Sequence, residues 1–125
     1  MGLFSGVIGN ASEANLEKVT QDYGKLLGSN EQIEKAYKLI RDMIIFTNKR
    51  LIVIDKQGLT GKKVEYHSVP YRAITNFKVE TAGHFDLDAE LKIFISGSST
   101  PIQKTFGSGS NIYEVQAILA EYCEK

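Results

Sequence analysis

The chain has 125 residues, of which 42% are hydrophobic, and its fifteen basic residues are balanced by fifteen acidic ones. A chain of this length forms one ordinary domain that buries roughly two-thirds of its unfolded surface, so it needs no disulfide or metal to fold. Zero net charge disfavours a nucleic-acid partner, the single cysteine fits a reducing cytoplasm, and no apolar run reaches the roughly 20 residues of a membrane span.

Residues 1–9 are apolar and glycine-rich without periodicity, and they are predicted to form an N-terminal tail. The tail could dock on a protein or dip into a membrane. Because it contains no lysine or arginine to hold a lipid headgroup, a free tail or docking on a protein is favoured over membrane contact. The rest of the chain, residues 10–125, is predicted to be a single domain.

A helix is predicted over about residues 11–27. Asn10 and Ser12 are candidate N-caps and Gly28 is the stop signal. One apolar stripe at helical spacing follows the caps and consists of Leu16, Val19, Tyr23 and Leu26. This stripe predicts that the helix lies on an apolar surface.

A strand over residues 32–41 and then a β-hairpin are predicted next. The hairpin has two short apolar runs, residues 43–46 and 51–54, which are too β-branched to favour a helix. Asn48, in the polar segment between them, is expected to supply the left-handed backbone of a tight turn. Both runs are apolar at consecutive positions, so both faces of the hairpin require a cover. The second cover is either a helix of the same chain or another subunit.

Further strands are predicted over residues 63–69, 73–81, 87–95 and 102–106, and a terminal helix over about 111–124. The strand over 87–95 alternates strictly between apolar and polar residues, which is typical of one buried and one solvated face. About seven short strands between residues 32 and 106 predict an antiparallel sheet that curls into a small barrel or sandwich. The fold class is therefore mainly β, with one helix at each end.

Several short motifs occur in one order along nearly the whole chain. They are Arg41-Asp42, Phe46-Thr-Asn-Lys-Arg-Leu51, Asp55-Lys-Gln-Gly58, Ser68-Val-Pro-Tyr71, Val79-Glu-Thr-Ala-Gly83 and Phe85-Asp-Leu-Asp88. In this order they resemble the bacterial pleckstrin-homology-like family, formerly a domain of unknown function. The resemblance implies a seven-stranded, bent antiparallel barrel capped by a C-terminal helix.

The resemblance also implies a function. Members of the family are not known enzymes, and no cofactor is expected. Short members assemble into cyclic rings, for which a pentamer is expected, and a polar surface where strands of adjacent protomers meet binds protein partners. The expected function is therefore a cytoplasmic, self-assembling scaffold whose protein partner the sequence does not identify.

Two polar groups are the candidate interface residues. The first lies around the hairpin and consists of Arg41, Asp42, Thr47, Asn48 and Arg50. The second is an acidic strand face, Asp86, Asp88 and Glu90, whose carboxylates could hold a hard cation but are more typical of a solvated or partner-facing surface. Because the hairpin region is basic, the two groups are expected to meet across a ring interface.

An alternative function is peripheral binding to anionic lipid headgroups. Residues 38–63 contain seven basic and two acidic residues, and ammonium and guanidinium groups pair with phosphate oxygens. The candidate anion-binding residues are Lys38, Lys49, Arg50, Lys62 and Lys63. Like-charge runs are usually solvated faces, so membrane contact is not favoured. His67, His84 and Cys123 show no nucleophile–base spacing, so no catalytic or metal site is predicted.

Overall fold

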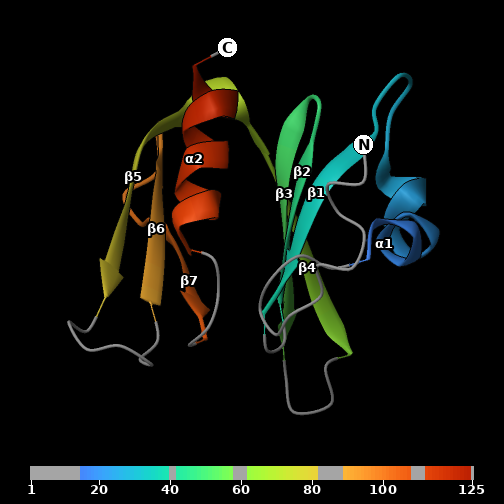
Figure 1. Ribbon diagram of the computed structural model, residues 1–125, viewed down its shortest axis with the longest axis horizontal. Coiled ribbons are helices and arrows are strands. Elements are labelled where there is room, and N and C mark those ends of the chain that lie inside the picture. The colour runs from blue at the N-terminus through green and yellow to red at the C-terminus, as the bar shows by residue number, and fades with distance from the viewer. Residues whose placement is uncertain (1–14, 40–41, 58–61, 82–88, 108–111, 125) are drawn as a thin grey trace. The chain divides into compact units, whose positions relative to one another are not determined.

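A computed structural model of the protein describes residues 15–39, 42–57, 62–81, 89–107 and 112–124 (Figure 1). The described elements are α1 (Leu16–Tyr23), the 3-10 helix η2 (Gly24–Leu26), β1 (Ile33–Lys38), β2 (Met43–Thr47), β3 (Arg50–Gln57), β4 (Lys63–Pro70), the 3-10 helix η3 (Tyr71–Ala73), β5 (Ile74–Thr81), β6 (Ala89–Ile95), β7 (Ile102–Phe106) and α2 (Ile112–Cys123). The mainly β prediction is confirmed.

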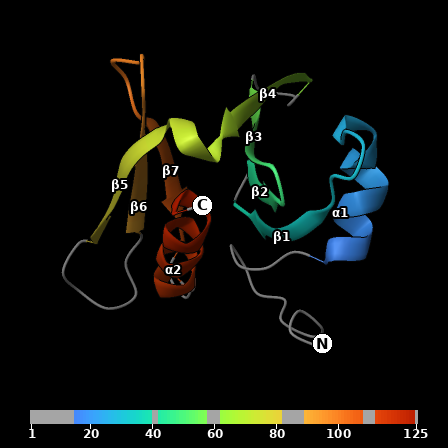
Figure 2. The same cartoon turned by 90° about the horizontal axis from the view of Figure 1, so that it is seen from above.

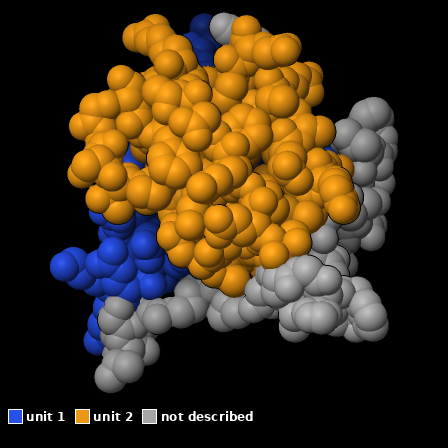
Figure 3. All heavy atoms as spheres, turned by 90° about the vertical axis from the view of Figure 1, so that its left-hand side faces the viewer, with its two compact units in different colours: residues 1–69 blue, residues 70–125 orange. Residues whose placement is uncertain are grey.

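The strands form two antiparallel sheets. One has the order β1-β2-β3-β4 and the other has the order β5-β6-β7. Each sheet belongs to one of two compact units, residues 1–69 and residues 70–125, which Figure 3 distinguishes by colour. Neighbours in both sheets are consecutive in the sequence, as expected for short strands joined by short connections.

The predicted hairpin is β2 and β3, in which Phe46 pairs with Leu51. The expectation that Asn48 adopts a left-handed backbone is wrong, because Asn30 (φ 61°) is the described non-glycine residue with positive φ. The turn is instead closed by a side chain. The Thr47 Oγ1 atom accepts hydrogen bonds from the backbone N–H groups of Lys49 and Arg50 at 3.0 and 2.9 Å, which fixes the chain without left-handed residues.

Both faces of the hairpin are buried, as the apolar pattern predicts. On one face, Val19 of α1 joins a core cluster with residues of β1, β2 and β3, each at most 2% exposed: Ala36, Ile45, Ile52 and Ile54. Figure 1 and Figure 2 both show α1 beside β1. The second cover is therefore a helix of the same chain, and burial of each large aliphatic side chain contributes about 1.5–3 kcal/mol.

The opposite face of the hairpin carries Ile44 and Phe46 on β2 and Leu51 and Val53 on β3, all buried. The ring of Tyr37 from β1 meets the ring of Phe46 edge-on, with centroids 6.1 Å apart and planes at 85°. This arrangement places the positive edge of one ring against the negative face of the other, which favours the pair beyond the area it buries.

The helix α1 is shorter than the predicted range of 11–27. It begins after Asn15, whose side chain accepts a hydrogen bond from the Lys18 N–H at 3.1 Å. An asparagine in extended conformation at this position caps the helix and ends it on the N-terminal side. The predicted caps Asn10 and Ser12 lie outside the described residues. After Tyr23 the chain continues as the 3-10 helix η2, and a 3-10 turn is a common ending of α-helices.

The second unit confirms the alternating strand. In β6, Ala89, Leu91 and Ile93 are buried, whereas Glu90 and Lys92 are half-buried. The first residues of the predicted strand, 87 and 88, lie outside the described ranges. The helix α2 packs against β5 and η3, with Val115 and Leu119 buried and the rings of Tyr122 and Tyr71 stacked at 4.8 Å.

Candidate functional site

The polar residues at the β2–β3 turn converge on the carboxylate of Glu31, whose side chain is 4% exposed. Thr47 Oγ1 donates to Oε2 at 2.7 Å, and Arg50 donates to both carboxylate oxygens, from Nε at 2.8 Å and from Nη2 at 3.1 Å. The backbone N–H of Gly28 donates to Oε1 at 2.8 Å. We refer to Glu31, Thr47 and Arg50 as the Glu31 cluster.

Arg50 connects the cluster to two further elements. Its Nη2 atom donates to the carbonyl oxygen of Leu26, the last residue of η2, at 2.6 Å. Its Nη1 atom donates to Ser68 Oγ on β4 at 2.7 Å. A guanidinium group has five N–H donors in a rigid plane, so one side chain can bridge η2, the following loop and β4.

The other two turn residues bind the same loop. Asn48 accepts from the Gln32 N–H at 2.8 Å and donates to the Asn30 carbonyl at 3.0 Å. Lys49 Nζ donates to the Ser29 carbonyl at 3.1 Å. The exposed residues of the turn therefore hold the loop between η2 and β1, and the left-handed backbone of Asn30 lies within that loop.

These contacts set the charge state of Glu31. The hydrogen bond from Arg50, followed by those from the Gly28 N–H and Thr47, lowers the pKa of Glu31 from its usual 4.5 to about 2, against the opposing effect of burial. Hydrogen bonds to the charged form stabilise a carboxylate relative to the protonated acid. Glu31 is therefore an anion throughout the physiological pH range, and it is a binding group rather than a proton donor.

The lowered pKa of Glu31 predicts a specific pH dependence of stability. A carboxyl group whose pKa is lower when folded stabilises the fold above its unfolded pKa of 4.5, and that contribution is lost as the pH falls toward about 2. Relative to Glu31→Gln, the native protein should be about 2–3 kcal/mol more stable at pH 7. Denaturation at a series of pH values should show this difference shrinking below pH 4.5. A difference that stays constant down to pH 2 would contradict the assignment.

The structure brings together some of the predicted interface residues. Thr47, Asn48 and Arg50 meet at the hairpin turn. Asp42 lies beyond the opposite end of β2, where its Oδ1 accepts from the Lys56 N–H at 3.2 Å. Glu90 accepts from Gln103 Nε2 at 2.6 Å on β6. Arg41, Asp86 and Asp88 lie outside the described residues, so the acidic strand face and its contact with a neighbouring protomer stay predictions.

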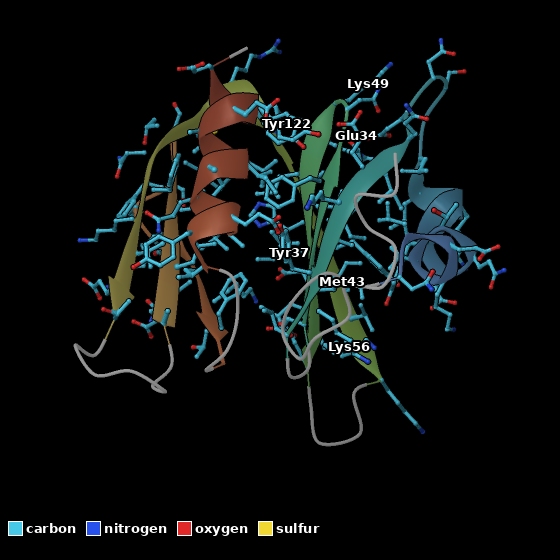
Figure 4. All side chains as sticks on the ribbon, in the orientation of Figure 1. Glu34, Tyr37, Met43, Lys49, Lys56 and Tyr122 are labelled. Carbon is cyan, nitrogen blue, oxygen red and sulfur yellow. The ribbon has the colours of Figure 1, made fainter. Side chains whose placement is uncertain are left out.

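The predicted anion-binding residues do not form one site. Lys49 and Arg50 are at the turn of the β2–β3 hairpin, where both bind the chain itself. Lys38, Lys62 and Lys63 are exposed at the other end of the sheet, where β1 ends and β4 begins. Figure 4 shows the separation through Lys49 and Lys56, which lie at opposite ends of β3.

Sequence reasoning missed Glu31 and Ser68. Glu31 precedes a predicted strand and resembles any solvated acidic residue, and its role depends on partners 16 and 19 positions away. The one local signal is the Gly28-Ser-Asn-Glu31 segment, because a glutamate side chain can reach back to the backbone N–H three residues earlier, as it does in a capping box.

Two edge strands carry the most exposed polar surface. The outer strand β4 exposes four consecutive residues, 65–68, among which Tyr66 is 49% exposed. The outer strand β5 of the other sheet exposes Thr75, Asn76, Lys78 and Glu80. Within the described part of the chain, no strand pairs with the outer side of either.

Neither a membrane span nor a metal cluster is found among the described residues. No described helix is long and apolar enough to cross a bilayer. No group of three or more histidine, cysteine, aspartate or glutamate side chains in the described ranges could hold a metal ion.

A family model described as "Bacterial PH domain" matches residues 2–123. The uncharacterised protein YjqA of Bacillus subtilis (strain 168) is 50% identical over 124 residues, which cover 98% of this chain and 99% of that protein.

Two solved structures are similar over their full length. A DUF1696 family protein with a pleckstrin-homology domain from Shewanella loihica PV-4 superposes with a TM-score of 0.80 at 56% identity, covering 93% of this chain and 99% of that one. A pleckstrin homology domain from Shewanella amazonensis SB2B gives a TM-score of 0.82 at 51% identity, covering 98% of each chain. The fold is therefore the pleckstrin-homology-like fold predicted from the sequence.

Proposed function

The chain belongs to the bacterial PH domain family, and from that premise we propose that it is a non-enzymatic domain that assembles with copies of itself into a closed ring and binds a protein partner at a polar surface between protomers. The observation that carries the proposal is the exposed edge strand β4, with its four consecutive exposed residues. Unpaired N–H and C=O groups on such an edge are a template for pairing with another chain.

The position of the apolar core favours polar edges as the assembly surface. Because α1 covers the second face of the hairpin, that face does not require another subunit. The strands β4 and β5 present different sequences at the edges of different sheets. Pairing between two unlike edges is heterologous, and a heterologous contact produces a ring when its rotation closes. Both edges mix the two signs of charge, which fits a polar surface for a protein partner.

Native mass spectrometry of the purified protein tests the assembly. We expect one discrete closed oligomer, a pentamer being the size that the family resemblance implies. Tyr66→Lys places an additional charge on the β4 edge and should shift the population toward monomer. Tyr113→Lys is the matched control, because Tyr113 is 81% exposed and lies on α2. A monomeric native protein, or equal effects of the two variants, would contradict a ring built through β4.

A second candidate function is peripheral binding to anionic headgroups, favoured by one cluster of lysines. Lys38, Lys56, Lys62 and Lys63 are exposed at one end of the β1-β2-β3-β4 sheet. Each lysine near an anionic surface contributes about 1 kcal/mol of attraction. The half-buried Asp42 and Asp55 lie at the same end and offset part of this charge.

Sedimentation with phosphatidylserine-containing vesicles tests the second candidate function. It predicts binding that high salt abolishes and that Lys62→Glu with Lys63→Glu weakens. Lys25→Glu is the matched control, because Lys25 is an exposed lysine on η2. Absence of binding at low salt would exclude the lipid function and leave the ring proposal.

A further inference from the structure

The cover that α1 forms over the sheet is intrinsically weak. The helix has eight residues and buries one of them, Val19. Isolated helices shorter than about 12–15 residues are marginal in water, so α1 depends on its contacts with the rest of the unit. Leu16 and Tyr23 are partly buried against the same cluster. The side chains of α1 alone therefore contribute little to keeping the helix packed on the sheet.

The strong attachment lies at the C-terminal end of this cover. The chain passes directly from α1 into η2, and Arg50 Nη2 holds the Leu26 carbonyl at the end of η2. The same guanidinium pairs with Glu31, which also binds the Gly28 N–H. At the N-terminal end, the described cap is the local bond between Asn15 and Lys18. Among the described residues, the hydrogen bond that links residues 16–26 to the hairpin is therefore the one from Arg50 to the Leu26 carbonyl, and Glu31 holds the guanidinium group that makes it.

The surface beneath α1 is apolar, and the strands that form it pair with one another and not with the helix. Ala36, Ile45, Ile52 and Ile54 come from three strands that pair with one another. None of the β1–β2 and β2–β3 ladder pairs involves a residue of α1. Removal of the helix would thus leave the described strand pairing intact while exposing a contiguous apolar face.

We propose that residues 16–26 form a hinged cover that opens from the sheet as one unit, and that the Glu31 cluster holds it closed. This inference concerns a conformational change of the single chain and does not depend on the proposed ring. Opening exposes the apolar face that α1 otherwise covers. The bonds made by Glu31 and Arg50 decide how often this occurs.

Native-state hydrogen exchange of the full chain, read by mass spectrometry at a series of sub-denaturing guanidinium concentrations, tests the proposal in the native protein. Amides of residues 19–27 should exchange through an opening with a lower free energy and a smaller denaturant dependence than those of β2 and β3. If both regions exchange through the same opening, with the same denaturant dependence, α1 does not open separately and the proposal is wrong.

Two variants should change the opening in opposite directions. Glu31→Gln removes the charged acceptor, and it should accelerate exchange of residues 19–27 by about tenfold or more, because the bonds of the Glu31 cluster are broken when the cover opens. Gly24→Ala should slow exchange there, because Gly24 has helical φ and ψ and an added Cβ would meet Thr20 Cγ2 at an ordinary 3.7 Å.

Lys18→Ala is the matched control for these variants. It removes an exposed ion pair with Asp22 on α1 itself, with side chains 69% and 45% exposed. Exchange of residues 19–27 should stay within about twofold of the native rate. Equal acceleration by Lys18→Ala and Glu31→Gln, or exchange of residues 19–27 that Glu31→Gln leaves at the native rate, would overturn the role of the Glu31 cluster.

Discussion

Replacing Arg50 with methionine should lower the free energy of unfolding by about 2–4 kcal/mol at pH 7. The substitution leaves the Glu31 carboxylate, 4% exposed, without its charged partner. It also removes the donors to the Leu26 carbonyl and Ser68 Oγ. Methionine keeps most of the aliphatic volume of arginine, so the loss reports on the polar contacts. Guanidinium denaturation monitored by circular dichroism measures it.

Controls separate the Arg50 effect from a general loss of charge. Lys18→Met removes an exposed pair and should cost no more than about 0.5 kcal/mol. Arg50→Lys keeps the charge but cannot reach Glu31, Leu26 and Ser68 with one ammonium group, so it should have an intermediate effect. If Arg50→Met lowers the free energy of unfolding by less than about 1 kcal/mol, the ion pair between Arg50 and Glu31 does not stabilise the fold as proposed.

A second substitution should partly reverse the first. In Arg50→Met the penalty comes mainly from a buried charge with too few partners, so adding Glu31→Gln removes that charge. The double variant should be more stable than Arg50→Met alone, although Glu31→Gln by itself destabilises the native protein. This change of sign distinguishes an ion pair from two independent packing contributions, which would add.

The hairpin shows how far the sequence determines the fold. Two β-branched apolar runs around a polar break predict β2 and β3 because local preference and burial agree at every position. The sequence predicts the conformation of the turn less well, because Asn30 rather than Asn48 has the left-handed backbone. A residue that tolerates positive φ does not require it, and Thr47 provides a local side-chain closure that composition does not reveal.

The apolar pattern also predicted that a second cover exists without identifying it. Any apolar surface covers the face of Ile45, Ile52 and Ile54 equally well, because the hydrophobic effect has no direction. The choice between α1 and a second subunit depends on where residues 24–32 lead the chain. That path is fixed by hydrogen bonds between residues that are separated by 16 to 24 positions in the sequence. A single sequence contains no signal for such pairs.

Charge along the chain was a poor guide to the candidate site. Residues 38–63 have an excess of basic residues, but the strands carry Lys49 and Lys63 to opposite ends of one sheet. Arg50 is neutralised by Glu31, which lies outside that segment. Counting charges in a window assumes that neighbours in sequence share a surface, and an antiparallel sheet violates that assumption at every strand.

Replacing Thr47 with valine should lower the free energy of unfolding by about 2–3 kcal/mol, although valine has the same shape and a higher strand preference. Thr47 is fully buried. Its hydroxyl donates to Glu31 Oε2 and accepts from the N–H groups of Lys49 and Arg50. Valine creates no cavity but leaves these buried groups without their partner, and thermal denaturation measures the cost.

Thr47→Ser is the matched control, because it keeps the hydroxyl and removes one methyl group, at a cost of about 1 kcal/mol. Serine should therefore be better tolerated than valine at a buried strand position, which is the reverse of the order that burial and strand preference predict. In Thr47→Val the pKa of Glu31, followed by carbon-13 NMR, should also rise from about 2, since one hydrogen bond to the carboxylate is lost. If valine were the more stable substitution, packing rather than the Glu31 cluster would determine the geometry of this turn.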